Sequence, residues 1–356
     1  MRFVPTSCLR EGMVLGDNLF NNFGELLLSQ GTSLNGDYLK SIKRLKYNGI
    51  YIDDDISRDI PVLNLISENL KAQTVKGIKD IFIQSEKGKV ARKDYVKKAK
   101  FQVEEIVDQI FSREKIMINV VDMKVFDDYT YYHSVNVAVL SIVIGVALDL
   151  DRDELCDLGF AGLLHDIGKV FIDKDLLNKP GELNQGEFEE LKRHSTLGGE
   201  HIKKSYGVST LAYMGILDHH EKFEGGGYPS GLQGKRISRY GRIIAVADVY
   251  DALTSDRPYR KALLPAEAME FVMASNMTAF DPEIVNVFVK KIAPYSIGSC
   301  VKLSNGLTGV VVENNGELCM RPKIRVYKDQ NDEEISPYEI NLANYDRLNI
   351  TVIGIV

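Results

Sequence analysis

The chain has 356 residues, of which 44% are hydrophobic and 26% charged, a composition typical of a globular protein with two or three domains. The formal net charge of −6 argues against a general nucleic-acid-binding protein or a membrane-surface protein, although a few local basic residues can still hold a small anion. The four cysteines form no CxxC pair, which excludes a zinc site of that type and favours a reducing compartment, the cytoplasm.

Residues 1–60 are predicted to form a small β-rich N-terminal domain, with strands at Glu25–Ser29 and Ile50–Ile52 and one helix that Asp37 would cap. Residues 61–115 show apolar residues at helical spacing, in one stripe from Ile66 to Phe82 and another from Tyr95 to Ile110. We expect these helices to act as a linker or an interface, and a homodimer through residues 61–115 is one expectation.

Residues 116–294 are predicted to be all-helical. The apolar run from Val137 to Leu148 is shorter than the roughly 20 residues that span a bilayer, so it indicates a buried core helix, within Tyr129–Leu148. Helix starts are predicted at four polar caps, namely Asp151 or Asp153, then Asn184, Ser238 and Asp281.

Residues 295–356 are predicted to form a small β-rich C-terminal domain, with strands Val301–Leu303, Thr308–Val312, Lys323–Tyr327 and Ile350–Ile353. The fold class is therefore multi-domain, with an all-α bundle as its core and small β-rich appendages at both ends.

The histidines carry the functional signal, because all six lie between His133 and His220. Seven potential ligands lie on predicted helices or at their ends: His133, His165, Asp166, His194, His219, His220 and Asp248. Helical bundles build metal centres from inward-pointing side chains of several helices. Imidazoles and carboxylates without thiolates favour a hydrolytic or redox-capable divalent centre. The set exceeds the needs of one ion, so we expect two, bridged most simply by Asp166.

These signals differ in strength. Asp248 is strong, because a carboxylate in an apolar helix needs a partner. His133 and His194 are each a weak signal of a metal site when taken alone. An adjacent pair such as His219-His220 is by itself more often found on a protein surface. His201 matches no ligand spacing and is predicted to be structural or exposed.

The order of these residues resembles the HD superfamily of metal-dependent phosphohydrolases. The segments 165–169 (HDIGK), 219–229 (HHEKFEGGGYP) and 248–260 (DVYDALTSDRPYR) resemble the HD-GYP subfamily, and the resemblance covers residues 118–290. It implies an HD-type helical bundle and hydrolysis of cyclic di-GMP to linear pGpG, in some members on to GMP, by a hydroxide that bridges two metal ions.

The resemblance also implies a role for each residue. His133, His165, Asp166 and Asp248 would hold one metal ion, and His194, His219 and His220 the second, with Asp166 bridging. Lys169 would steady the phosphate and act with Asp166 in catalysis. Gly227, Tyr228 and Pro229 would shape the substrate loop, in which Tyr228 could stack on a guanine, and Arg257 and Arg260 would reach phosphate or guanine edges. Iron or manganese is expected, and nickel or cobalt also suits the ligands.

Two departures from the family pattern stand out. Tyr129 occupies the position of a glutamate that helps some members hold a third metal, so two metals are expected here, and Glu224 replaces the usual aspartate before the glycine run. Two other functions compete: a non-catalytic cyclic di-GMP effector, and a phosphohydrolase acting on another nucleotide. Retention of all seven ligands favours catalysis, and the loop at Gly227–Pro229 favours cyclic di-GMP. Contacts with a diguanylate cyclase or a regulator are a further expectation.

Overall fold

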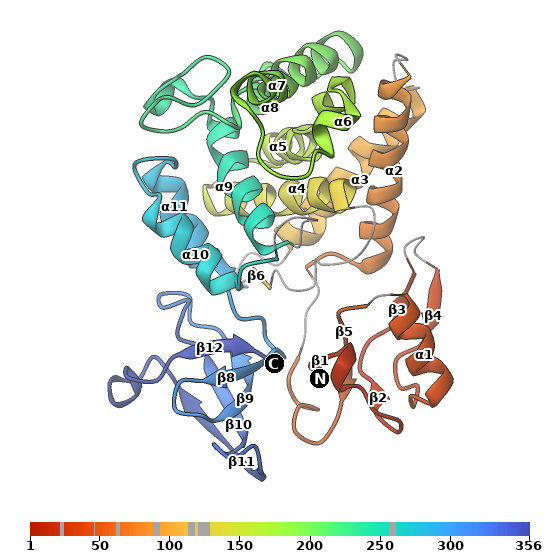
Figure 1. Ribbon diagram of the computed structural model, residues 1–356, viewed down its shortest axis with the longest axis vertical. Helices are drawn as coiled ribbons and strands as arrows, with labels where there is room; N and C mark the ends of the chain where they lie inside the picture. Colours follow the sequence, from red (N-terminus) through yellow and green to blue (C-terminus); the bar gives the residue numbers. More distant parts are fainter. Residues whose placement is uncertain are drawn as a thin grey trace.

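The computed structural model describes residues 1–21, 25–45, 47–61, 65–87, 93–112, 129–255 and 261–356, with residues 118–119 and Tyr129 described by their backbone alone. Figure 1 shows a body of helices and, at one end of it, two small β regions that lie side by side. This arrangement confirms the predicted fold class of an all-α core with β-rich regions at both ends of the chain.

The helical body is built from helices that range from 4 to 21 residues in length. They are α2 Glu68–Glu86, α3 Lys93–Phe111, α4 Tyr129–Ala147, α5 Arg152–Leu164, α6 Lys174–Leu177, α7 Gln185–Ser205, α8 Thr210–Asp218, α9 Arg239–Thr254, α10 Pro265–Ala274 and α11 Pro282–Lys291, with the 3₁₀ turns η3 Ile167–Phe171 and η4 Gly234–Arg236. The side chains of Asp151, Asn184, Ser238 and Asp281 accept hydrogen bonds from backbone N–H groups of the following turn, which confirms these N-caps.

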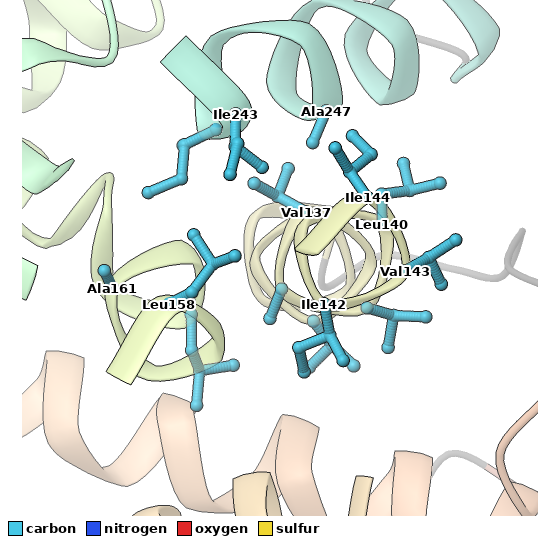
Figure 2. Packing of buried hydrophobic residues seen from close by; sticks show 14 of the residues in the cluster. Val137, Leu140, Ile142, Val143, Ile144, Leu158, Ala161, Ile243 and Ala247 are labelled. Atoms are coloured by element: carbon cyan, nitrogen blue, oxygen red, sulfur yellow. The ribbon is translucent and has the colours of Figure 1, made fainter. Parts of the chain in front are cut away.

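Helix α4 lies at the centre of this body. Figure 2 shows it surrounded by apolar side chains, including Leu158 from α5 and Ile243 from α9. Among the described residues, one stretch, Thr130–Ala147, is long and apolar enough to cross a membrane, and 78% of it is buried inside the protein. A helix that is apolar on every face belongs in a core, so α4 is the core helix that the sequence predicted.

The apolar stripes of α2 and α3 face the helical body. They are buried, with Ile78 and Ile106 fully inaccessible, in the same hydrophobic cluster as α4 and α5. These stripes therefore pack within the helical body. A homodimer through residues 61–115 stays a prediction, and it would have to use other faces of these helices.

The N-terminal β region contains β1 Arg2–Pro5, β2 Val14–Leu15, β3 Leu19–Phe20, β4 Leu26–Leu28, β5 Gly49–Asp53 and the helix α1 Gly36–Arg44. β5 lies between β1 and β2 and is antiparallel to both, while β3 and β4 form a separate hairpin. Helix α1 begins after Asn35, whose side chain accepts hydrogen bonds from the backbone N–H groups of Asp37 and Tyr38 at 3.1 and 2.9 Å. The predicted cap Asp37 is thus two residues too late.

The C-terminal β region is a five-stranded antiparallel sheet in the order β11-β10-β9-β8-β12. Its strands are β8 Cys300–Leu303, β9 Thr308–Glu313, β10 Lys323–Lys328, β11 Glu334–Asn341 and β12 Val352–Ile355. The sequence did not predict β11, an edge strand whose residues are mostly exposed and carry no apolar alternation. A two-residue strand β6, Ile118–Asn119, pairs in parallel with β7, Ile292–Ala293, so residues 116–294 are not purely helical.

The two β regions contact each other. The backbone N–H of Phe3 donates to the carbonyl oxygen of Gly298 at 2.8 Å. The guanidinium of Arg325 forms two bonds with the carboxylate of Asp59, at 2.6 and 2.8 Å. Planar guanidinium groups match carboxylates in this forked geometry, so Arg325 fixes the N-terminal region against the sheet.

Candidate metal centre

Five helices or their ends supply the predicted ligands, and the structure brings all seven side chains together. His133 lies in α4, His165 and Asp166 follow α5, His194 lies in α7, His219 and His220 follow α8, and Asp248 lies in α9. They form three overlapping groups in which the potential ligand atoms lie within 4.8 Å of one another: Asp166 with His194, His219 and His220; His133 with His165 and Asp166; His165 with His219 and Asp248.

The carboxylate of Asp166 lies between these groups. Its Oδ2 atom is 3.4 Å from Nε2 of His165 and 3.8 Å from Nε2 of His133, whereas its Oδ1 atom is 3.6 Å from Nε2 of His194. On the first side, Nε2 of His133 lies 3.1 Å from Oδ1 of Asp248. The two oxygens of Asp166 thus face different imidazoles. A carboxylate that bridges two cations needs its oxygens arranged in this way.

Three imidazoles are oriented by their own helices. Nδ1 of His165, of His194 and of His219 each lies 2.7 Å from the carbonyl oxygen three residues earlier. A carbonyl oxygen only accepts, so Nδ1 carries the proton and Nε2 keeps its lone pair. The Nε2 atoms of all three, and Oδ1 of Asp166, are buried without a hydrogen-bond partner. Buried polar atoms are rarely left unpaired, so these four atoms fit a site that holds a cation.

His133 is held differently, by a residue that the sequence analysis missed. Its Nδ1 atom lies 2.7 Å from Oδ2 of Asp251, whose other oxygen accepts a hydrogen bond from the amide of Asn136 at 2.7 Å. Asp251 is buried three residues after Asp248 in α9. A second buried carboxylate one turn from a predicted ligand was the signal that could have found it.

Burial keeps three of the other imidazoles neutral. It lowers the pKa of His194 and holds the pKa of His219 well below its usual value. It also lowers the pKa of His220 to about 3, although the nearby carboxylates oppose the shift. Neutral imidazole is the form that binds a metal ion, so these three residues need no deprotonation at neutral pH.

The pKa values of Asp166 and His133, which lie close together, shift in opposite directions. Burial alone would raise the pKa of Asp166, but the positive charge of Lys169 is the largest opposing effect, and the pKa lies well below the usual range. Burial alone would lower the pKa of His133, but hydrogen bonds to Asp248 and Asp251 raise it to about 9. A cation between these carboxylates and His133 would take the place of that proton.

A close backbone contact positions Lys169. Its Nζ atom lies 2.5 Å from Oδ2 of Asp166, and the lysine side chain is 35% exposed. The intervening turn η3 packs against α7 at Gly168, where a Cβ atom would lie 1.8 Å from the carbonyl oxygen of His194. Only glycine allows this approach, and the approach places Asp166 and Lys169 beside His194.

The loop after α8 covers one side of the centre. The buried carboxylate of Glu221 accepts hydrogen bonds from the backbone N–H groups of Ser230 and Leu232, at 2.7 and 3.0 Å, and so ties the far end of the loop to its start. The ring of Tyr228, within the predicted substrate segment Gly227–Pro229, lies 4.7 Å from the ring of His220 at an angle of 30°. This segment therefore borders the centre.

Several predicted features lie elsewhere. Arg257 and Arg260 fall outside the described residues, as does the side chain of Tyr129. His201 lies outside the three groups, and its Nε2 atom contacts the hydroxyl groups of Ser85 and Tyr206 at 2.9 and 3.3 Å. It connects α7 with α2 in the structural role that the sequence analysis expected.

The donor set fits a divalent metal centre. Five imidazoles and two carboxylates, largely buried and with no thiolate among them, suit first-row divalent ions in preference to a structural zinc. The unpaired Nε2 atoms point into the cluster from separate helices, the pattern found in bundle metal sites.

The fold and this centre are similar to those of HD-domain proteins over part of the chain. Residues 115–284 match the family model described as HD domain, and residues 300–353 match the model described as KOW domain associated with HD domain. A segment similar to HD domains is thus followed by a segment similar to a KOW domain.

The chain is similar in sequence to curated proteins named as phosphodiesterases. It is 40% identical over 225 residues to a cyclic di-GMP phosphodiesterase of Pseudomonas aeruginosa, covering 63% of this chain and 54% of the relative. It is 38% identical over 191 residues to 3′3′-cGAMP-specific phosphodiesterase 1 of Vibrio cholerae, covering 53% and 43%. The chain spans about half the length of these relatives. A solved HDG"Y"P protein of Bdellovibrio bacteriovorus aligns with 80% of this chain and 97% of its own, at 18% identity and a TM-score of 0.49.

Proposed function

We propose that this protein is a metal-dependent phosphodiesterase that hydrolyses cyclic di-GMP to linear pGpG, with further cleavage to GMP as a second step to test. The observation that carries this proposal is the cluster of seven donors in which three imidazole Nε2 atoms and one carboxylate oxygen are buried and unpaired. The 40% identical relative named a cyclic di-GMP phosphodiesterase supports the choice of substrate.

Each donor has a role in this proposal. His133, His165, Asp166 and Asp248 hold one cation, and His194, His219 and His220 hold the second, with Asp166 shared between them. The group of Asp166 with the last three histidines supports this division, although the third group, His165 with His219 and Asp248, joins both sides. Divalent cations there would polarise a phosphate oxygen and make water nucleophilic at neutral pH.

The remaining residues act on the substrate. The ammonium of Lys169 lies beside the centre and is partly exposed, so it can stabilise the negative charge that develops on the phosphate. Tyr228 offers an aromatic surface next to His220 for a base. Arg257 and Arg260 complete the proposed substrate contacts.

A second substrate is favoured by a specific finding. The relative from Vibrio cholerae that is 38% identical is named for 3′3′-cGAMP, which differs from cyclic di-GMP in one base. A non-catalytic effector remains the other class of function, and it differs in binding a cyclic dinucleotide without cleaving it.

Metal identity and compartment complete the proposal. We expect iron or manganese, two ions per chain, and action in the cytoplasm. Elemental analysis after anaerobic purification measures the first two, and cell fractionation measures the third.

The test uses the full chain, purified anaerobically and reconstituted with each metal, and offered cyclic di-GMP, 3′3′-cGAMP and pGpG. Asp166→Asn and His194→Gln should lose both bound metal and turnover. His201→Gln is the matched control, because it changes a histidine of the same helix outside the centre. Metal-loaded protein that binds the dinucleotides but cleaves none would reject the hydrolase in favour of the effector.

A further inference from the structure

Two side chains of α7 form a surface feature beside the loop. The Nζ atom of Lys192 lies 4.7 Å from the ring centre of Phe188 and 5.7 Å from that of Tyr228. The two rings lie 6.5 Å apart at 80°, and Phe188 is 44% exposed. An ammonium thus sits across two aromatic rings, one of which is open to solvent.

This feature continues outward from the metal centre. The ring of Tyr228 lies 4.7 Å from that of His220 and 6.3 Å from that of His194, and Lys192 precedes His194 by two residues on α7. Phe188, Lys192 and Tyr228, which we call the outer wall, therefore extend from the ligand cluster to the surface.

The ammonium of Lys192 can exchange its partner. It contacts the carboxylate of Glu189 at 2.7 Å, and the Glu189 side chain is 60% exposed. The Lys192 side chain is 26% exposed, so the pair is partly open to water, which screens it, and an anionic ligand can take the place of Glu189. Positive charge next to an aromatic face suits a ligand with a phosphate and a base.

A cyclic dinucleotide has two phosphates and two bases, and a centre that cleaves one phosphodiester leaves the other half of the ring outside it. We propose that the outer wall is the subsite for this second half: Phe188 stacks on its base, and Lys192 pairs with its phosphate. This inference rests on the proposed function. It adds two substrate-positioning residues that no sequence motif marked.

The same helix provides a control. Lys203 lies 4.8 Å from the ring centre of Tyr213, a cation–π contact of the same kind, near the opposite end of α7. If such contacts serve only packing, changes at Lys192 and at Lys203 should have equal effects. If the outer wall binds substrate, only the change at Lys192 should affect it.

Steady-state kinetics of the metal-loaded full chain test this inference. Phe188→Leu and Lys192→Met keep most of the packing volume, and each should raise KM by about tenfold with kcat nearly unchanged, as expected for loss of one stacking or phosphate contact. Lys192→Arg should restore a KM close to the unmodified value, and Lys203→Met should not change it. Unchanged KM in both Phe188→Leu and Lys192→Met would overturn the subsite, as would a fall in kcat alone.

A binding measurement separates this inference from the proposed function. A phosphorothioate analogue of cyclic di-GMP that resists hydrolysis is titrated into the same metal-loaded variants. Weaker binding in Phe188→Leu and Lys192→Met, but not in Lys203→Met, supports the subsite even if the unmodified protein cleaves nothing. Equal binding in all variants, or no binding to the unmodified protein, overturns it.

Discussion

The contact between η3 and α7 gives the sharpest test of how the fold positions the centre. In Gly168→Ala the new Cβ atom would lie 1.8 Å from the carbonyl oxygen of His194 and 2.6 Å from the backbone nitrogen of Gly198. A Cβ atom essentially never lies within 3.0 Å of a non-bonded heavy atom, so η3 and α7 must separate by about 1 Å or more. Both atoms in the way belong to the backbone of a helix, which cannot yield as a flexible side chain does.

The expected losses of stability and turnover follow from that displacement. Overpacking at a tight contact destabilises a protein by about 1–3 kcal/mol. Gly168 lies between Asp166 and Lys169, and it faces His194, so the shift also separates residues that the proposed reaction needs together. A misplacement of about 1 Å can cost about 10²-fold in rate. We therefore expect Gly168→Ala to lose both stability and at least that much turnover.

Two glycines of α7 provide graded controls. A Cβ atom at Gly198 would lie 3.0 Å from the backbone nitrogen of Gly168, a tight contact, whereas one at Gly186 would meet only the side-chain oxygen of Asn184, at an ordinary 3.5 Å. Gly198→Ala should be intermediate. Gly186→Ala should be neutral or stabilise the helix by about 0.5–1 kcal/mol.

The assay measures thermal unfolding and cyclic di-GMP turnover of the three variants with metal bound. The expected order of damage is Gly168→Ala, then Gly198→Ala, then Gly186→Ala. If Gly168→Ala matches Gly186→Ala in both measurements, the backbone contact does not position the centre and the reasoning is refuted.

Three further changes probe contacts outside the ligand cluster. Asp251→Asn replaces the carboxylate that holds Nδ1 of His133, so metal affinity, measured by chelator competition, should fall about 10–100-fold; unchanged affinity would show that other contacts orient the ring. Burial lowers the pKa of His201 from 6.5, so the unfolded chain binds more protons below that pH. The stability that the neutral His201 ring contributes is complete above pH 6.5 and is lost as pH falls through the folded pKa. The free energy of unfolding should therefore decline less on acidification in His201→Gln than in the unmodified protein. A steeper decline in the variant would contradict this. Arg325→Ala removes the forked pair with Asp59, whose side chain is 69% exposed, so stability should fall by about 1 kcal/mol or less. Hydrogen exchange in residues 54–60 should rise, and turnover should not change. A loss of turnover would mean that this contact affects the metal centre.

Local chemistry made much of the helical body predictable. The caps Asp151, Asn184, Ser238 and Asp281 bond to backbone groups within three residues, so the sequence contains both partners. The candidate ligands could be proposed for a related reason, because a buried histidine or carboxylate needs a partner wherever the chain folds.

The tertiary structure decided which residues meet. Asp251 orients His133 across 118 positions of the chain, and Gly168 touches the backbone of His194 in a different element. Such contacts leave no periodic pattern, because they depend on how two helices cross and not on the residues of either one. The same reason explains why the packing of α2 and α3 was not predicted. Their apolar stripes were visible in the sequence, but the neighbours that bury these stripes were not. The sequence alone therefore determined which side chains require partners, and the packing of the helices selected those partners.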